Sequence, residues 1–275
     1  MKITFVNMPL RESASPNTPP EGPLILASIL KKYDHEVSLL DLNAYRIKDT
    51  TSESKSLPNG RHLSYGEVEE LIHKHLSNSG DQDVFAFSGK ITTLRWQEEV
   101  AKIVRRLQPD CFLVTGNGLA TEIREGLFNW IPELDAIARS EGDSIILDIV
   151  QDAKLIKDRG ISSAINSNQI KANYIGEISG KHRFVYEGGR PKNLDDIPYG
   201  ALELLESDPY GKNILEEYIK VPVWGTAANN SSATPFTMKR SLTTVSSRGC
   251  PYACAFCYRG AQGERNYGMR SCEHI

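Results

Sequence analysis

The stretch Ser246–Tyr258 has the sequence SSRGCPYACAFCY and holds three of the five cysteines of the chain. Cys250, Cys254 and Cys257 are spaced C-x3-C-x2-C, directly after a β-branched run at Thr243–Val245 that predicts a strand. A strand that leads into a short cysteine loop places three thiolates around one small volume. An iron–sulfur cube suits that volume best, and three thiolate ligands leave its fourth iron without a protein donor. The spacing therefore predicts a [4Fe–4S] site with one open iron.

The motif resembles the cluster signature of the radical S-adenosylmethionine (SAM) superfamily, in which an aromatic residue, here Phe256, precedes the third cysteine. The resemblance implies that Cys250, Cys254 and Cys257 ligate the cluster. It also implies that SAM chelates the open iron and is cleaved to a 5′-deoxyadenosyl radical, with Phe256 near the adenine.

The residues around the first cysteine narrow this resemblance. The preceding Ser-Arg-Gly and the following Pro-Tyr are similar to the subgroup whose members carry an N-terminal cobalamin-binding domain. Methyl transfer to an unactivated carbon is the commonest reaction of that subgroup, in which ring rearrangements and cyclisations also occur. The resemblance thus implies a transferase with a [4Fe–4S] cluster, SAM and cobalamin as cofactors. It further implies a small-molecule substrate and an electron donor such as flavodoxin or ferredoxin.

The composition is that of an ordinary globular protein. With 275 residues, of which 24% are charged and 40% hydrophobic, the chain has room for one or two domains. A formal net charge of −3 gives no electrostatic case for nucleic acid or an anionic membrane as a partner. No apolar run approaches about 18 residues, so no membrane span is predicted. The cysteines cluster toward one end rather than forming a disulfide framework, so a reducing cytoplasm is expected.

Residues 1–158 predict an α/β domain with a doubly wound, Rossmann- or flavodoxin-like parallel sheet. Apolar segments with the length of buried strands alternate with amphipathic helices, and the expected strands are residues 3–6, 36–42, 84–89, 111–115 and 135–139. A capping box with Ser64 as the N-cap and Glu67 three residues later predicts a helix to about Leu76. The polar residues 46–63 are expected to form an exposed loop.

A different pattern begins near Gly160. Alternating segments at 173–178 and 182–187 flank a Ser-Gly-Lys turn and predict a β-hairpin within a hairpin and linker region that spans 159–240. Residues 241–275 are expected to form the first βα portion of a radical SAM barrel of the TIM type. Such a barrel needs several further βα units. We therefore expect the chain to be an N-terminal fragment or half of a split protein, and to be inactive alone.

Ligands of open parallel sheets bind beyond the carboxyl ends of the strands. The candidate cobalamin-binding residues at those ends are Pro20, Glu21, Gly22, Ser88, Gly89, Gly116, Asn117, Gly118, Glu141 and Gly142. Their order is similar to that of the B12-binding domains of radical SAM proteins. The alternative that each glycine serves an ordinary tight turn stays open. A dinucleotide is not expected, because the turn after the first strand lacks G-x-G-x-x-G, and Asp41 is then a loop cap.

Three histidines and Cys111 are expected to have structural roles rather than to bind a metal. No D-x-H-x-x-G string, with which other cobalamin domains of this fold place a histidine on cobalt, occurs in the sequence. His35, His73 and His75 are expected at the surface, so we predict no histidine ligand on the lower face of a bound cobalamin. Cys111 begins an apolar strand and is expected in the core. It cannot supply the second three-cysteine cluster that a methylthiotransferase requires.

Two alternatives to the enzyme interpretation remain. The three motif cysteines could form a zinc site with Cys272, and His274 is a further candidate ligand, although structural zinc sites usually pair two C-x2-C knuckles. The chain could also be a non-catalytic module that binds cobalamin or a partner and carries a vestigial cysteine loop. The sequence assigns no catalytic side chain and does not define the substrate.

Overall fold

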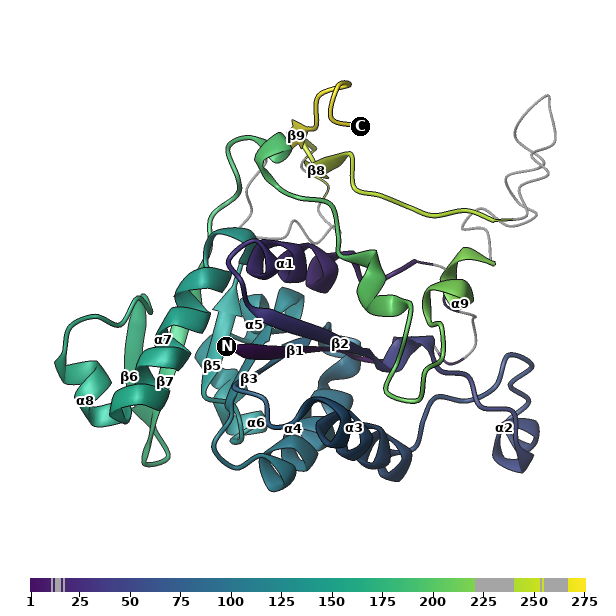
Figure 1. The fold of residues 1–275 in the computed structure, drawn as a ribbon, viewed down its shortest axis with the longest axis horizontal. Coiled ribbons are helices and arrows are strands. Elements are labelled where there is room, and N and C mark those ends of the chain that lie inside the picture. The colour runs from purple at the N-terminus through teal and green to yellow at the C-terminus, as the bar shows by residue number, and fades with distance from the viewer. Residues whose placement is uncertain (11, 13–15, 17, 221–239, 253, 255–266) are drawn as a thin grey trace.

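The computed structural model describes residues 1–10, 12, 16, 18–220, 240–252, 254 and 267–275. A seven-stranded sheet with the strand order β2-β1-β3-β4-β5-β7-β6 forms its centre (Figure 1). The neighbours pair in parallel, except that β6 is antiparallel to β7. The strands are β1 (Lys2–Asn7), β2 (Glu36–Asp41), β3 (Val84–Ser88), β4 (Phe112–Gly116), β5 (Ala136–Arg139), β6 (Tyr174–Ile178) and β7 (Lys181–Glu187). The α/β fold expected from the alternating apolar pattern is confirmed.

Helices cover both faces of this sheet. On one face α1 (Glu21–Lys31) packs beside α7 (Ile146–Arg159), and on the other α3 (Tyr65–Ser79) packs beside α4 (Leu94–Leu107) (Figure 1). The shorter helices are α2 (Thr50–Ser54), α5 (Asn117–Ile123), α6 (Leu127–Trp130), α8 (Ile161–Asn166) and α9 (Leu215–Ile219). Because β2 lies on one side of β1 and β3 on the other, the strand order reverses between β1 and β3, where sheets of this class bind ligands.

Short 3-10 helices join several of these elements, at Leu42–Ala44, Ile91–Thr93, Arg124–Gly126, Gly142–Ser144, Leu194–Asp196 and Leu202–Leu205. One of them, Arg124–Gly126, separates α5 from α6. Arg124 there has a positive φ of 57°, which ends α5 before α6 begins.

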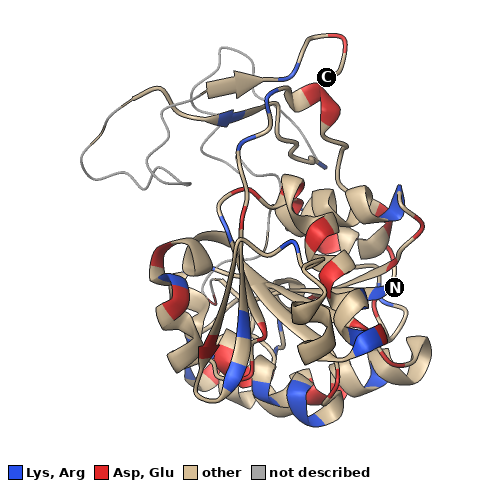
Figure 2. Cartoon of the chain, turned by 90° about the vertical axis from the view of Figure 1, so that its left-hand side faces the viewer, with Lys and Arg blue, Asp and Glu red and all other residues tan. Residues whose placement is uncertain are grey.

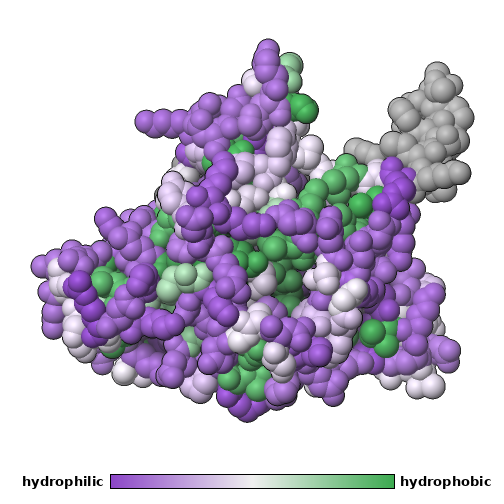
Figure 3. All heavy atoms as spheres, viewed as in Figure 1, coloured by the Kyte–Doolittle hydropathy of each residue, from purple (hydrophilic) through white to green (hydrophobic). Residues whose placement is uncertain are grey.

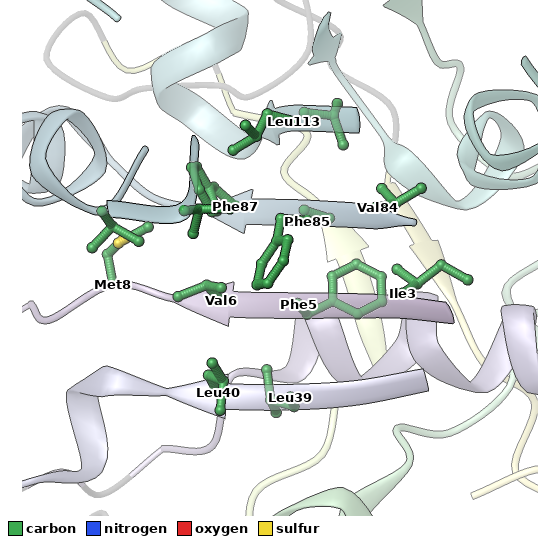
Figure 4. Close-up of a cluster of buried hydrophobic side chains, with 14 of the residues drawn as sticks. Ile3, Phe5, Val6, Met8, Leu39, Leu40, Val84, Phe85, Phe87 and Leu113 are labelled. Carbon is green, nitrogen blue, oxygen red and sulfur yellow. The ribbon is translucent and has the colours of Figure 1, made fainter. Parts of the chain in front are cut away.

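The core lies where the central strands meet the helices. Ile3, Phe5 and Val6 of β1 and Val84, Phe85 and Phe87 of β3 are all buried and lie side by side in Figure 4. Strands covered on both faces carry continuous apolar runs rather than alternating ones. That covering explains why these segments could be recognised from sequence.

The start of α3 follows the sequence prediction. The Ser64 hydroxyl accepts a hydrogen bond from the Glu67 N–H, and the Glu67 carboxylate accepts one of 2.7 Å from the Ser64 N–H. The preceding residues differ from the expected loop, because Asp49 caps the short helix α2 through the Ser52 N–H. Arg61 then joins Asp49 to Glu67 by ion pairs of 2.6 and 2.7 Å.

His75 is buried on α3, and its expected surface position is wrong. Its Nε2 lies 2.9 Å from the Thr4 hydroxyl, in a polar cluster beneath β1 that also includes Gln82. His75 follows Val68 by seven residues and Leu71 by four, so it falls on the face of α3 that packs against the sheet.

The predicted hairpin is confirmed as β6 and β7, and it belongs to the central sheet. β7 pairs in parallel with β5 and places Phe184 and Tyr186 in the core. Gly188 follows β7 directly, and a Cβ at this position would collide with the carbonyl oxygen of Glu141. The sheet therefore continues beyond the five strands expected in residues 1–158, and the end of β7 reaches the turn after β5.

The cysteine segment differs from the expected strand at Thr243–Val245. Residues 240–246 are extended without strand pairing, and β8 (Ser247–Gly249) pairs antiparallel with β9 (Tyr267–Met269). Figure 1 shows this pair above α1. The Arg270 guanidinium, which lies over the Tyr199 ring, donates 2.7 Å and 3.1 Å hydrogen bonds to the carbonyl oxygens of Ile197 and Val245. The pair is thereby attached to the linker.

Acidic and basic residues are interspersed over the helices (Figure 2), and the formal net charge of −3 offers no electrostatic case for nucleic acid. In the part of the chain that the structure describes, no helix is both long enough and apolar enough to cross a bilayer.

Candidate functional site

A pocket of about 610 Å³ lies between the carboxyl ends of β1, β3, β4 and β5 and the segment Val245–Cys250. Its apolar lining consists of Phe5, Pro23, Ile25, Leu26, Ala86, Phe87, Val114, Ala138, Ile146 and Ile149. Figure 3 shows apolar atoms in the middle of the molecule, surrounded by a mainly polar surface. The volume is within the range of small-molecule sites, and the position is that expected for ligands of doubly wound sheets.

Most residues that the sequence predicts as ligand contacts line this pocket. They are Glu21, Gly22, Ser88, Gly116, Asn117, Glu141 and Gly142, from four separate turns. Cys250, the first cysteine of the motif, lines the same pocket. The parallel arrangement of the strands brings the four turns to one edge of the sheet. The predicted turns and the first cysteine of the motif therefore meet at one place.

Three predicted contacts do not line the pocket and have structural roles. Pro20 precedes α1 as its N-cap residue. A Cβ on Gly89 would collide with the side chains of Gln97 and Thr93 on and before α4, so close packing requires glycine there. The Gly118 N–H donates a 2.6 Å hydrogen bond to the Asn117 side chain within its own turn. For these three, the ordinary turn interpretation applies.

Two residues that line the pocket have left-handed backbone conformations. Asn117 has a φ of 72° and Ser140 a φ of 66°. The Asn117 side chain donates a 3.2 Å hydrogen bond to the Ser88 hydroxyl, and the Ser140 N–H donates one of 3.0 Å to the Thr121 hydroxyl. Such conformations cost free energy and persist where neighbours hold them. The ends of β3, β4 and β5 are thus fixed to one another around the pocket.

Arg248 joins the cysteine segment to the turn after β5. Its guanidinium donates hydrogen bonds of 2.6 and 3.1 Å to the two carboxylate oxygens of Asp143 and one of 3.2 Å to Glu141. Although burial disfavours its charged form, the hydrogen bond and charge of Asp143 raise the pKa of Arg248 above its usual value. Neither Arg248 nor Asp143 was predicted from the sequence to be a site residue. The sequence feature that could have pointed to Asp143 is its position directly after the predicted Glu141–Gly142 turn.

Glu21 forms a second contact to the same segment. Its carboxylate accepts a 2.7 Å hydrogen bond from the Val245 N–H. Burial raises the pKa of Glu21, although the Val245 N–H and the charges of Arg248 and Arg270 act in the opposite direction. A carboxyl group at the first residue of α1 therefore lies against the chain that leads to Cys250.

The described cysteines of the motif are free and exposed. Cys250 and Cys254 have accessible thiols, whereas Phe256 and Cys257 lie outside the described residues. Within the described ranges, no three His, Cys, Asp or Glu side chains form a group that could hold a metal ion. The described part of the chain therefore does not bring Cys272 or His274 together with both Cys250 and Cys254.

Cys111 behaves as the sequence predicts. It is buried among the core residues, and burial raises the pKa of its thiol to about 12. A thiol held in this form is a poor ligand and a poor nucleophile at neutral pH. The role of Cys111 is packing.

Comparisons with known proteins add one distant relative. No family model matches the chain. An uncharacterized methyltransferase of Pyrococcus horikoshii is 26% identical over 282 residues, a match that covers 100% of this chain and 49% of that protein. The chain thus spans about half the length of the curated relative it matches.

A solved structure was also matched. An alpha-glucosyltransferase in complex with UDP-glucose and DNA containing an abasic site has 14% sequence identity and a TM-score of 0.35. The match covers 71% of this chain and 44% of that one. A likeness at this level supports no inference about the site, so the α/β assignment depends on the strand order and pairing described above.

Proposed function

We propose that this protein works as a cobalamin-dependent radical SAM enzyme that transfers a methyl group. One observation carries the proposal: Cys250, the first residue of the C-x3-C-x2-C motif, lies at the pocket formed by the strand ends of the α/β sheet. The first cysteine of the motif and the turns predicted to bind a cofactor thus line one cavity. The distant methyltransferase relative supports the transferase class.

In this proposal Cys250, Cys254 and Cys257 hold a [4Fe–4S] cluster. The cluster would supply the open iron that binds SAM and the electron that cleaves it. Neither Cys250 nor Cys254 is in a disulfide, so both thiols are available as ligands. Exposed free thiols and such a cluster also favour a reducing compartment, so we place the protein in the cytoplasm.

The pocket combines apolar side chains with polar turns at its edge. A flat corrin ring with polar amide side chains at its margin has the matching chemistry, and we assign the pocket to cobalamin. Small residues at Gly22, Gly116 and Ala138 leave room beside the strand ends, and a Cβ on Gly22 would meet no atom within 4 Å. Cobalamin would supply the transferable methyl group. The apolar side chains exclude water from the cavity, and the turns after β4 and β5 provide polar contacts at its edge. No described residue of the lining is a histidine.

The cluster assignment is tested by anaerobic reconstitution of the 275-residue chain with iron and sulfide. We expect a brown protein that gives the electron paramagnetic resonance signal of a reduced [4Fe–4S] cluster, with a signal that changes when SAM is added. Alanine at Cys250, Cys254 or Cys257 abolishes iron binding. Alanine at Cys111 or Cys272 serves as the matched control and leaves the iron content unchanged.

Two outcomes would each contradict one of the assignments. A chain that binds zinc but no iron, and loses the zinc when Cys272 is replaced, would identify a structural zinc site. Iron binding without any affinity for cobalamin would show that the pocket is not a cobalamin site, although the cluster assignment would stand. Titration with hydroxocobalamin, followed by its absorption spectrum, decides this second point.

A further inference from the structure

Arg248 contacts residues more than 100 positions away in the sequence. It lies on β8, two residues before Cys250, and its partners Asp143 and Glu141 lie in the turn after β5. We call the hydrogen bonds from its guanidinium to these two carboxylates the Arg248 bridge. Asp143 accepts on both carboxylate oxygens, a geometry that fixes the orientation of the planar guanidinium as well as its position.

Burial distinguishes this bridge from ion pairs on the surface. The side chains of Arg248 and Asp143 are 16% and 6% exposed. Arg240, on the same extended segment, forms a similar two-point contact with Glu216, but those side chains are 57% and 44% exposed. Water and salt screen exposed pairs, whereas a partly buried pair with several hydrogen bonds is weakened much less. The Arg248 bridge is therefore the stronger attachment.

Every member of the bridge also lines the pocket. Glu141 and Asp143 line it from the turn after β5, and Arg248 and Cys250 line it from the cysteine segment. Arg190, which follows β7, lies 3.9 Å from the Glu141 carboxylate and lines the pocket as well. A ligand that fills the cavity contacts the turn that holds Arg248. The position of Cys250 therefore depends on the same carboxylates that form the ligand site.

We propose that Arg248 is a positioning residue that holds the cysteine segment over the pocket through Asp143 and Glu141, so that pocket occupancy and the placement of Cys250 are coupled. The coupling to pocket occupancy rests on the proposed function. The Arg248 bridge itself does not depend on any cofactor. The guanidinium acts on Cys250 through the backbone of β8, which ends at Gly249, rather than by contact with a reacting group.

The ligand-free test is hydrogen–deuterium exchange of the full chain, read in peptides that cover Val245–Gly249. Arg248→Ala is expected to speed exchange of these amides about tenfold. Local opening of the segment in this variant no longer costs the free energy of breaking the Arg248 bridge. Arg240→Ala, which removes the exposed pair on the same segment, changes it by less than about twofold. Asp143→Asn weakens the same bridge from the other side and is expected to cause the same loss of protection from exchange.

A double variant separates coupling from general destabilisation. If Arg248 and Asp143 act as one unit, the variant that carries both Arg248→Ala and Asp143→Asn exchanges no faster than Arg248→Ala alone. Unchanged exchange in both single variants, or fully additive effects in the double variant, would overturn the bridge. A loss of fold would appear as faster exchange throughout β1 and β3, and Asp143→Asn then decides the result.

The coupling between pocket occupancy and the cysteine segment is tested by adding hydroxocobalamin to the same proteins. Binding is expected to slow exchange at Val245–Gly249 in the natural chain and to leave it unchanged in Arg248→Ala. Equal protection in both proteins would overturn the coupling. If hydroxocobalamin does not bind the natural chain, the proposed function fails, while the ligand-free comparison still decides whether Arg248 holds the segment.

Discussion

The carboxylate of Glu21 accepts a 2.7 Å hydrogen bond from the backbone N–H of Val245, a residue 224 positions further along the chain. Glu21 is the first residue of α1, where a negative side chain also interacts favourably with the helix dipole. Val245 begins the segment that continues through Arg248 to Cys250. The first helix of the sheet domain and the segment that leads to Cys250 thus meet directly at one side chain.

Replacing Glu21→Ala removes this acceptor, whereas Glu21→Gln keeps an oxygen at the same distance. We expect the Val245 amide to exchange several-fold faster in Glu21→Ala and at nearly the natural rate in Glu21→Gln. Nuclear magnetic resonance resolves this single amide. Equal acceleration in both variants would show that the charge at the helix start, and not the hydrogen bond, holds the segment.

Gly22 offers a way to fill the pocket without disturbing the fold. It is the second residue of α1, lines the pocket and has open space around its Cβ position. Gly22→Leu is expected to weaken hydroxocobalamin binding by at least about tenfold, an effect of about 1.4 kcal/mol. Helix stability does not suffer, because leucine has a higher helix propensity than glycine.

Gly66 provides the matched control for that variant. It is the second residue of α3, also has open space around its Cβ position, and is absent from the pocket lining. Gly66→Leu is expected to leave the dissociation constant unchanged. If both leucine variants bound the ligand equally well, the ligand would occupy some other part of the molecule.

His75 makes the stability of the fold depend on pH. Burial lowers its pKa to about 4, whereas the unfolded chain has an ordinary histidine pKa near 6.5. The unfolded state therefore binds more protons between these values. The contribution of His75 is complete above about pH 6.5 and falls by about 1.4 kcal/mol per pH unit as the pH drops toward 4.

Urea unfolding between pH 5 and 7 measures this dependence. His75→Gln is expected to reduce the slope of unfolding free energy against pH, and His73→Gln, at an exposed position on the same helix, is the control. An identical slope in the natural chain and in His75→Gln would show that the buried ring does not take up a proton on unfolding.

Asp41 is fully enclosed and depends on its hydrogen-bond donors. The Tyr218 hydroxyl, the Asn7 side chain at 2.7 Å and the Asn43 N–H at 3.1 Å all donate to its carboxylate. Tyr218→Phe removes one donor and is expected to lower the free energy of unfolding by about 1–3 kcal/mol. Tyr210→Phe, at a largely exposed ring, changes it little. Equal unfolding midpoints for both variants would refute this role.

The sequence predicted the parts of the fold that local patterns encode. The continuous apolar runs around Phe5, Phe85 and Leu113 are typical of strands buried on both faces, and the Ser64 capping box begins a helix by local hydrogen bonds. Residues at strand ends could also be placed together, because parallel strands end at one edge. That rule brought Gly22 and Glu141 into one site before any contact was known.

Features that depend on distant partners were not predictable in the same way. The Arg248–Asp143 contact joins residues 105 positions apart, and no local pattern pairs one arginine with one aspartate. Among the described residues no strand pairs with Thr243–Val245, so these β-branched residues do not join a described sheet. His75 could have been placed in the core, since it continues the buried face of α3.

The position of β7 has a practical consequence for dissecting the molecule. β7 shields the side of β5 that faces away from β4, and its Phe184 and Tyr186 complete the core there. A recombinant piece cut at residue 158 would leave the backbone amides of β5 open to a strand from another molecule, which invites aggregation. A piece that ends after residue 190 keeps that edge covered and retains Gly188 and Arg190. Any isolated cofactor-binding unit should therefore be made with the hairpin still attached.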